Sequence, residues 1–362
     1  MSRALDKDTF ALLKYDDPKS VYHSIVAALR TDTGEEALLE IEFLAKGHPL
    51  SPGCDVLIDG SNLAIPKAKL VQAFLVARLI LFKFLKDCPP EKVDELRDAT
   101  AVILLMDPEH LTAANTRKRL LQKLLSHKSV APEAVLRSEL RFVDTYLTSR
   151  LHRHTKSPTL WSHRRWILEQ TESIRLRHDL LRDLSSVILV AAERHPRNYY
   201  AFLHMRWLLE AINDTPCLEQ PTSQQPAPRH GQIISVVKDW CLRHPADTSG
   251  FSFLLHLITS SMDSESITKR LVERSRIFTE VTDLAVSFRW THETVFVFLR
   301  TLVAEGSQQS DSVKFYEAIR SILAQHPQNQ RIVEAARDWC TKYRQNIQQE
   351  DPSFSMQTGS QE

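Results

Sequence analysis

One helix motif recurs five times along this chain and constrains its fold more than any other feature. In each copy an anchor residue is followed by a mostly basic residue at offset +4 and an aliphatic residue at +7. The copies are Ala114/Lys118/Leu121, Trp161/Arg165/Leu168, Phe202/Arg206/Leu209, Phe251/Leu255/Ile258 and Phe296/Arg300/Val303. These offsets fall on one face of an α-helix. The anchors are 47, 41, 49 and 45 residues apart, and a period in the forties, long enough for two helices, is typical of a helical-repeat solenoid.

Glycine content and charge narrow the fold class and the partners. Only 8 of the 362 residues are glycine, against a usual share of about 7%. Because glycine supplies the positive-φ positions of hairpins and phosphate-binding loops, its scarcity predicts an all-α protein. The 46 basic and 45 acidic residues give a formal net charge of +1. That balance gives no electrostatic reason to bind nucleic acid or an anionic membrane surface. Stable membrane insertion is not expected either.

Cysteine usage and the chain ends predict a cytoplasmic protein. The five cysteines include no C-x-x-C pair, which favours a reduced chain without structural disulfides. The amino terminus lacks the apolar core of a secretory signal, and the carboxy terminus is not a C-a-a-X box. The longest apolar stretch, residues 70–85, is interrupted by Gln72, Arg78 and Lys83. It is therefore interpreted as a buried amphipathic helix and not as a membrane span.

The periodicity divides the chain into three expected parts. Residues 1–65 form an irregular segment with short helices at 20–30 and 35–46 and a β-like piece at 55–58. Residues 66–348 form a helical-hairpin repeat domain with a loop insertion near 213–229, and residues 349–362 form a disordered tail. The expected helices of the repeat domain are 67–87, 91–106, 110–126, 132–152, 158–170, 173–194, 198–212, 230–243, 248–260, 264–288, 292–305, 312–325 and 329–347.

Two copies of the motif resemble a known family. Their sequences are Lys156-Ser-Pro-Thr-Leu-Trp-Ser-His-Arg-Arg-Trp-Ile-Leu168 and Arg197-Asn-Tyr-Tyr-Ala-Phe-Leu-His-Met-Arg-Trp-Leu-Leu209. They are similar to the repeat of protein prenyltransferase alpha subunits, Asn-Tyr-x-x-Trp-x-x-Arg-Arg-x-x-Leu. The weaker copies look closest to a divergent branch of that family, the alpha subunits of type III geranylgeranyltransferase. Pro158 at the tyrosine position, and Tyr200 where farnesyltransferase-type chains have a histidine, fit that branch.

The resemblance implies a right-handed α-α superhelix, a crescent-shaped solenoid of helical hairpins that works as half of a heterodimer. The partner would be a beta subunit, here of the Rab type, which carries the zinc ion and the isoprenoid cavity; this chain would hold no metal or cofactor of its own. Zinc would bind the C-terminal cysteine of a protein acceptor as a thiolate. The thiolate would then displace diphosphate from geranylgeranyl diphosphate.

The resemblance also assigns residues to this reaction. Lys156 stands where the family has a lysine that stabilises the departing diphosphate, and a fixed cation beside developing negative charge lowers the barrier. Asn198 and Tyr199 match the Asn-Tyr pair beside the substrate cavity, and Tyr200 completes the expected substrate-binding group.

The remaining motif residues are expected to be structural. The aromatic anchors Trp161, Phe202, Phe251 and Phe296 would pack between neighbouring hairpins. The cations at +4, Lys118, Arg165, Arg206 and Arg300, would form ion pairs between repeats or cap helix ends, with a smaller chance of facing a partner. His163 and His204 share offset +2, which favours a structural role over a site.

Two other functions compete with the transferase. One is a non-enzymatic helical-repeat scaffold that binds a peptide or a folded partner. Tetratricopeptide repeats of that kind keep a period of about 34 residues, whereas the spacing here varies from 41 to 49. The other is an RNA-binding helical repeat, which the neutral charge balance disfavours.

Overall fold

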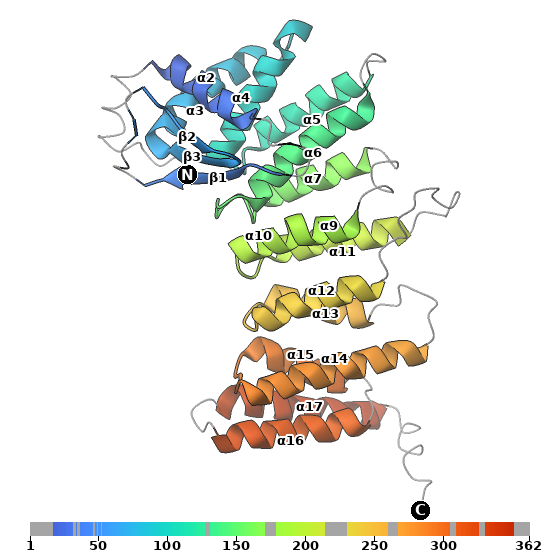
Figure 1. Ribbon diagram of the computed structural model, residues 1–362. Coiled ribbons are helices and arrows are strands. Elements are labelled where there is room, and N and C mark those ends of the chain that lie inside the picture. Colours follow the sequence, from blue (N-terminus) through green and yellow to red (C-terminus); the bar gives the residue numbers. More distant parts are fainter. Residues whose placement is uncertain are drawn as a thin grey trace, which may run out of the picture. The chain divides into compact units, whose positions relative to one another are not determined.

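The computed structural model describes residues 17–31, 34, 37–45, 48, 50–51, 53–126, 131–170, 179–213, 230–259, 267–304, 309–325 and 330–350. It contains two compact units, Met1–Ile212 and Asn213–Glu362, and each is described here by itself (Figure 1). None of the described helices is long and apolar enough to cross a membrane.

The first unit begins with three packed helices. Helix α2 (Pro18–Leu29) starts at Asp17, whose side chain accepts a hydrogen bond from the Lys19 amide and so caps the helix. Helix α3 (Lys67–Phe84) packs against both α2 and α4 (Val93–Met106), and the short 3₁₀ turn η1 (Pro90–Lys92) leads into α4. A bidentate pair between Arg30 and Asp98 joins the end of α2 to α4.

A small sheet lies in the segment where a helix was expected. Strand β1 (Glu40–Leu44) pairs in parallel with β3 (Asn62–Pro66), and β2 (Leu57–Asp59) pairs antiparallel on the other side of β3. The helix predicted at 35–46 is therefore wrong at residues 40–44, because pairing with β3 buries Ile41 and Leu44 in a way that local helix propensity does not register. The β-like piece predicted near residues 55–58 is confirmed as β2.

The rest of the first unit is a succession of helical hairpins (Figure 1). The helices are α5 (Leu111–Ser126), α6 (Pro132–Thr148), α7 (Pro158–Glu169), α9 (Leu180–Asp183), α10 (Leu189–Arg194) and α11 (Tyr199–Asn213). Between α9 and α10 the helix continues through a π-helical turn, η2 (Leu184–Ile188). Helix α6 ends at Thr148, four residues before the predicted end, and a turn over residues 149–157 leads into α7.

The second unit repeats the hairpin plan. Its helices are α12 (His230–Arg243), α13 (Thr248–Thr259), α14 (Ile267–Ser287), α15 (Glu293–Ala304), α16 (Gln309–Gln325) and α17 (Gln330–Glu350). Helix α12 packs on α13, α14 packs on α15 and α16, and α15 packs on α17. The anchors Phe251 and Phe296 are buried in this unit, and the Phe251 ring meets the Phe298 ring edge-on at 5.3 Å.

The predicted all-α class and succession of hairpins are confirmed, with the small sheet as an addition. The predicted insertion near 213–229 lies outside the described residues except for Asn213, and so does the predicted tail except for residues 349 and 350, which belong to α17. The predicted domain boundary at residues 65 and 66 stays a prediction.

Gly250 offers a test of packing in the second unit. A methyl group at Gly250, on α13, would lie 2.5 Å from Cζ3 of the buried Trp240 and 3.2 Å from Cys241 Sγ. We expect Gly250→Ala to lower the free energy of unfolding by about 1–3 kcal/mol through overpacking. The matched control is Gly231→Ala on α12, where a methyl group meets nothing within 4 Å. Urea unfolding followed by circular dichroism measures both, and equal stability of the two variants would contradict the packing shown.

Candidate functional site

The turn over residues 149–157 is the part of the first unit that carries the predicted catalytic lysine. Ser149 Oγ accepts a hydrogen bond from the Ile41 amide (3.0 Å), and the Arg150 amide donates to the Ile41 carbonyl (3.1 Å). At the other end, Ser157 Oγ accepts from the Leu160 amide (3.1 Å) and caps α7. Strand β1 and helix α7 thus fix the two ends of the turn.

A buried histidine holds the middle of the turn. His154 Nε2 lies 3.0 Å from the Leu104 carbonyl oxygen and 2.9 Å from that of Leu105. Phe43 and Tyr146 meet the His154 ring edge-on. Burial lowers the pKa of His154 to about 4, against an ordinary value of 6.5, so the ring is neutral at pH 7 and donates one proton to these carbonyls.

Asn198 and Trp161 fix the residue just before Lys156. The Thr155 carbonyl accepts hydrogen bonds from Asn198 Nδ2 (2.7 Å) and from Trp161 Nε1 (3.0 Å). Asn198 also donates to the Ala191 carbonyl (3.2 Å), and its Oδ1 accepts from the Ala201 amide (3.4 Å). Both side chains are buried, so Asn198 positions the turn; its predicted contact with substrate stays a prediction.

Lys156 lies at the edge of this buried framework. It is half-buried, and its Nζ stands 5.6 Å from the centre of the Tyr199 ring, within the range of a cation–π interaction. The Tyr199 and Tyr200 rings are 4.1 Å apart, and Tyr199 is 48% exposed. The structure therefore brings Lys156, Tyr199 and Tyr200 together.

His195 joins this group and was not predicted from the sequence. Its ring meets the His152 ring at 4.6 Å. Burial of the imidazole, followed by electrostatic interaction with His152 and Lys156, lowers the pKa of His195. We call Lys156, His195, Tyr199 and Tyr200 the rim cluster. The hydrogen bond between the two tyrosines, followed by partial burial, raises the pKa of Tyr200, so its phenol stays protonated near neutral pH. The cluster thus offers one ammonium group and hydroxyl donors to an anion.

The anchors behave as predicted, whereas three of the +4 cations contact aromatic rings. Trp161, Phe202, Phe251 and Phe296 are buried packing residues. The cations stack on a tryptophan further along the chain: Lys118 on Trp166 (5.5 Å), Arg165 on Trp207 (4.7 Å) and Arg300 on Trp339 (4.5 Å). Arg206 is half-buried, and the ion pair of Arg165 is with Glu169 of its own helix. Lys118, Arg165 and Arg300 thus each make a cation–π contact, and the ion pair between repeats that was expected for Arg206 stays a prediction.

The buried cations lie one residue earlier, at offset +3, and sequence reasoning missed them. Arg117 makes a bidentate pair with the buried Glu139 (2.6 and 2.7 Å), which also accepts from His163 Nε2 (2.8 Å). Burial alone would raise the pKa of the Glu139 carboxyl, but the Arg117 guanidinium and the His163 hydrogen bond hold it below its usual range. The Arg-Arg doublet at 164 and 165 was the available signal, since adjacent residues point about 100° apart on a helix.

Arg164 forms a second buried network. Its guanidinium donates to Asp144 Oδ1 (2.7 Å), to Asp183 and to His204 Nε2 (2.6 Å). Burial alone would lower the pKa of Arg164, but the two carboxylates raise it. The structural role expected for His163 and His204 agrees with these contacts, because each completes the buried charge network of the preceding repeat.

Comparison with known proteins finds similarity to this part of the chain. The profile described as "Protein prenyltransferase alpha subunit repeat" matches residues 136–171, which span α6, the turn and α7. Over these residues the chain is similar to that repeat. A second profile, described as "ECM9 middle domain", matches residues 160–281. The repeat predicted from the strongest copies is thus confirmed.

Curated relatives carry the same repeat in their names. "Protein prenyltransferase alpha subunit repeat-containing protein 1" of Danio rerio is 32% identical over 46% of this chain and 38% of its own length. The Homo sapiens protein of that name is 27% identical over 52% of this chain and 45% of its own length. The chain thus spans less than half the length of these relatives. A solved structure, "Candida albicans protein geranylgeranyltransferase-I complexed with GGPP", aligns with 94% of this chain and 92% of that chain, at 13% identity and a TM-score of 0.44.

The turn generates a pH prediction. The folded-state pKa of His154, about 4, lies below its unfolded value of 6.5, so the unfolded chain takes up the proton first. The contribution of His154 to the free energy of unfolding is therefore fully present above pH 6.5. It falls by about 3 kcal/mol as the pH drops from 6.5 toward 4. We expect the unfolding free energy of His154→Gln to fall less over this window than that of the unsubstituted chain. The exposed His152, changed to Gln, is the control; identical pH profiles for all three proteins would refute the assignment.

The two neighbouring arginines of α7 generate a stability prediction. Arg164→Ala leaves two carboxylates buried without their cation, and we expect a loss of about 3–5 kcal/mol in the unfolding free energy of the first unit. Arg165→Ala removes an exposed cation and is expected to cost less than about 1 kcal/mol. Urea unfolding measures the free energy of unfolding of both variants. A larger loss for Arg165→Ala than for Arg164→Ala would contradict the buried network.

Proposed function

We propose that this chain is the alpha subunit of a heterodimeric protein geranylgeranyltransferase. The observation that carries the proposal is the position of Lys156: a half-buried ammonium group on a rigid turn, inside the segment that matches the prenyltransferase alpha subunit repeat. The names of the curated relatives, which refer to the same repeat, support this proposal.

The partner in this proposal is a prenyltransferase beta subunit, of the Rab type by resemblance, which carries the zinc ion and the isoprenoid cavity. Zinc would hold the C-terminal cysteine of the acceptor as a thiolate. A new bond forms between that sulfur and the allylic carbon of geranylgeranyl diphosphate, while the carbon–oxygen bond to diphosphate breaks. Both proteins would meet their substrates in the cytoplasm.

The rim cluster supplies the contribution of this chain. Negative charge builds up on the diphosphate as the carbon–oxygen bond breaks, and the Lys156 ammonium group stabilises that charge. The hydroxyl groups of Tyr199 and Tyr200 are available to donate hydrogen bonds to the same oxygens. Because Thr155 and Ser157 are buried and hydrogen-bonded on either side of Lys156, the cation needs little reorganisation to act.

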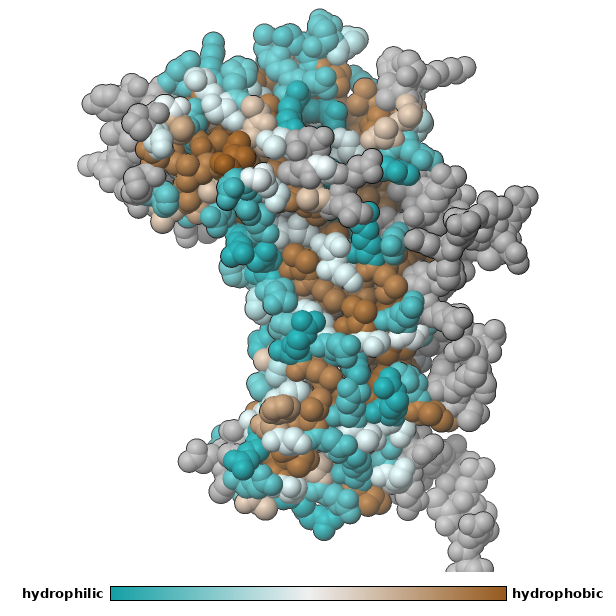
Figure 2. All heavy atoms as spheres, in the orientation of Figure 1, coloured by the Kyte–Doolittle hydropathy of each residue, from teal (hydrophilic) through white to brown (hydrophobic). Residues whose placement is uncertain are grey.

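Exposed apolar residues on the anchor helices support a protein partner. Leu111 on α5 and Tyr199 on α11 each stand three residues before an anchor and are 63% and 48% exposed. Leu203, next to the anchor Phe202, is 55% exposed. In each unit, hydrophobic residues also reach the surface in patches on the face drawn in Figure 2. Exposed hydrophobic patches of this kind mark interaction surfaces.

The first test is affinity purification of the tagged chain from cytosol, with mass spectrometry of the proteins that copurify. A stoichiometric prenyltransferase beta subunit would support the proposal and justify an assay of isoprenoid transfer. The competing function, a non-enzymatic scaffold, predicts another partner and no transfer. The exposed apolar residues serve either function, whereas Lys156 matters only to the transferase.

The second test is Lys156→Ala in the reconstituted heterodimer. We expect the rate of geranylgeranyl transfer to fall roughly 10²-fold, because a cation beside the leaving group is lost. Heterodimer assembly, measured by size-exclusion chromatography, should be unchanged. Arg153→Ala is the matched control, since Arg153 is an exposed cation of the same turn that pairs with Asp107 (2.9 Å). Loss of assembly by Lys156→Ala without a defect in the residual complex would overturn the role of Lys156.

A further inference from the structure

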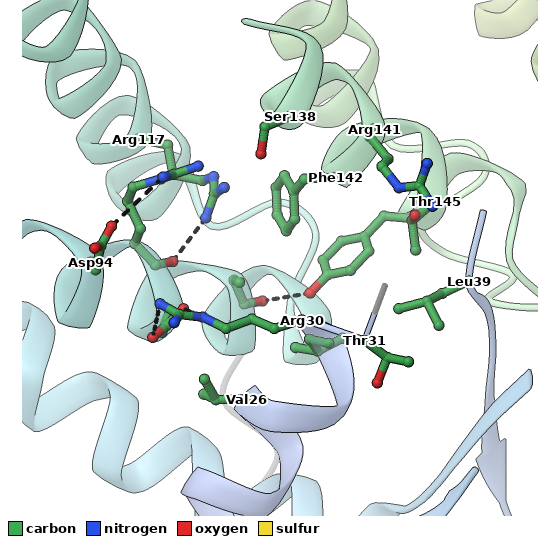
Figure 3. Close-up of a pocket in the computed structure, with 15 residues that line it drawn as sticks. Val26, Arg30, Thr31, Leu39, Asp94, Arg117, Ser138, Arg141, Phe142 and Thr145 are labelled. Carbon is green, nitrogen blue, oxygen red and sulfur yellow. Dashed lines mark hydrogen bonds and ion pairs between the residues drawn. The ribbon is translucent and has the colours of Figure 1, made fainter. Parts of the chain in front are cut away.

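The cations of the first unit differ in whether carboxylates of this chain already face them. Figure 3 shows a cleft of about 490 Å³ that α2, α4, α5 and α6 line. Three of its arginines face carboxylates: Arg30 faces Asp98, Arg117 faces Glu139, and Arg97 faces both Asp94 and Glu139. Lys156 lies against the Tyr199 ring and forms no ion pair with any described residue. The rim cluster is therefore better suited than the cleft to an external anion.

A histidine stands seven residues before the anchor in three neighbouring copies of the repeat. The pairs are His154 and Trp161, His195 and Phe202, and His244 and Phe251. His154 bonds through Nε2 to two carbonyl groups near the end of α4. His244 Nδ1 lies 2.8 Å from the Trp240 carbonyl oxygen, and its ring stacks on the Trp240 ring at 4.2 Å. In these two copies the histidine thus contributes to the fold.

His195 lacks such hydrogen bonds, although it holds the same repeat position. Neither of its ring nitrogens has a hydrogen-bond partner among the described residues, and Nδ1 is buried. The ring contacts the His152 ring edge-on, with the two centroids 4.6 Å apart. Because the side chain as a whole is half-buried, the edge that carries Nε2 is the one open to solvent. Hydrogen bonding within the described fold therefore does not account for His195.

The buried Nδ1 also decides which nitrogen of His195 carries the proton. A proton on Nδ1 would be a buried donor without an acceptor, and such donors are rarer in proteins than unsatisfied acceptors. The proton of the neutral ring therefore belongs on Nε2. Burial of the imidazole, followed by electrostatic interaction with His152 and Lys156, lowers the pKa of His195, so the ring is neutral at pH 7.5. His195 thus presents one N–H donor toward solvent.

The described carboxylates around His195 do not accept this proton. Glu40 on β1 pairs with Arg194, the residue before His195 (2.8 Å), and also with Arg150 (3.2 Å). His152 and Lys156 interact with His195 from the turn, and its sequence neighbours Glu193 and Arg197 are exposed. The Lys156 ammonium group and the His195 N–H group are thus both available to one external anion.

We propose that His195 donates a hydrogen bond from Nε2 to the diphosphate that Lys156 binds. This inference rests on the proposed function, which supplies the diphosphate. A lysine ammonium group acts as a point charge on a flexible stem and does not fix the orientation of an anion. An imidazole N–H donor is directional, and its hydrogen bond to a charged oxygen is about twice as strong as one to a neutral oxygen. His195 therefore orients the leaving group, while Lys156 neutralises it.

Isothermal titration of the full chain with inorganic pyrophosphate at pH 7.5 tests this role. His195→Leu should weaken binding about tenfold or more, because a hydrogen bond to a charged group is lost. His195→Gln retains a donor near the position of Nε2 and should bind within about threefold of the unsubstituted chain. The urea unfolding midpoint of both variants should be unchanged, since the His195 ring makes no hydrogen bond with the described residues. His244→Leu, at the same repeat position in the second unit, is the control and should leave pyrophosphate binding unchanged.

The pH dependence separates a neutral donor from a charged one. The loss caused by His195→Leu should persist at pH 8.5, because a neutral imidazole does not titrate there. A loss that disappears at pH 8.5 overturns the assignment, and so does equal weakening by His195→Leu and His195→Gln. Unchanged binding by His195→Leu, or no pyrophosphate binding by the unsubstituted chain, also overturns it. The proposed function would stand in each of these cases if transfer by the heterodimer still falls with Lys156→Ala.

Discussion

A single buried guanidinium, that of Arg164, determines how the hairpins of the first unit fit together. It lies on α7 and donates to Asp144 on α6, to Asp183 at the end of α9 and to His204 on α11. A buried charge is costly unless its partners are in place, so a shift of any of these helices by one residue would leave a charge unpaired. Hydrophobic anchors such as Trp161 tolerate small displacements more easily, because packing contacts are not directional. The ionic network therefore fixes the register between neighbouring repeats, which hydrophobic packing of the anchors alone would not fix.

The framework behind Lys156 follows from that register. Asn198 reaches the Thr155 carbonyl from the start of α11, and Trp161 reaches it from α7. Both helices are held by Arg164, so residues of two repeats converge on one carbonyl oxygen. His154 adds a third support from the carbonyls at the end of α4. The backbone at Lys156 is thus held in place by hydrogen bonds, while its side chain can adjust. Such a positioned cation is what electrostatic stabilisation of a leaving group requires.

The sequence predicted the helices and anchors well and the polar contacts poorly. Amphipathic periodicity carries helix positions, so the helices from α3 to α17 were found with small errors at their ends. The ion pair between repeats was expected at Arg165 and not at Arg164, because the motif was followed only at offsets +4 and +7. Position +3 is also buried in every copy: Arg117, Arg164, Met205, Leu254 and Leu299. Since only two of these five are charged, no repeated pattern revealed the networks, and the partners Glu139 and Asp183 are distant in sequence.

The π-helical turn η2 lets buried residues spaced four apart stay on one face of a helix that has 3.6 residues per turn. The buried residues of this helix recur every four positions, as Leu180, Leu184, Ile188 and Ala192 and again as Asp183, Val187 and Ala191. A regular α-helix advances 3.6 residues per turn, so a stripe with a period of four would drift by about 40° at each step and by about 120° over three steps. A π-helical turn takes up roughly one additional residue and cancels most of that drift. Asp183 can therefore face Arg164 while Ala191, two turns later, still lies against the Asn198 amide. The π-helical turn thus lets one helix make the ionic contact with Arg164 near its start and the hydrogen bond with Asn198 near its end.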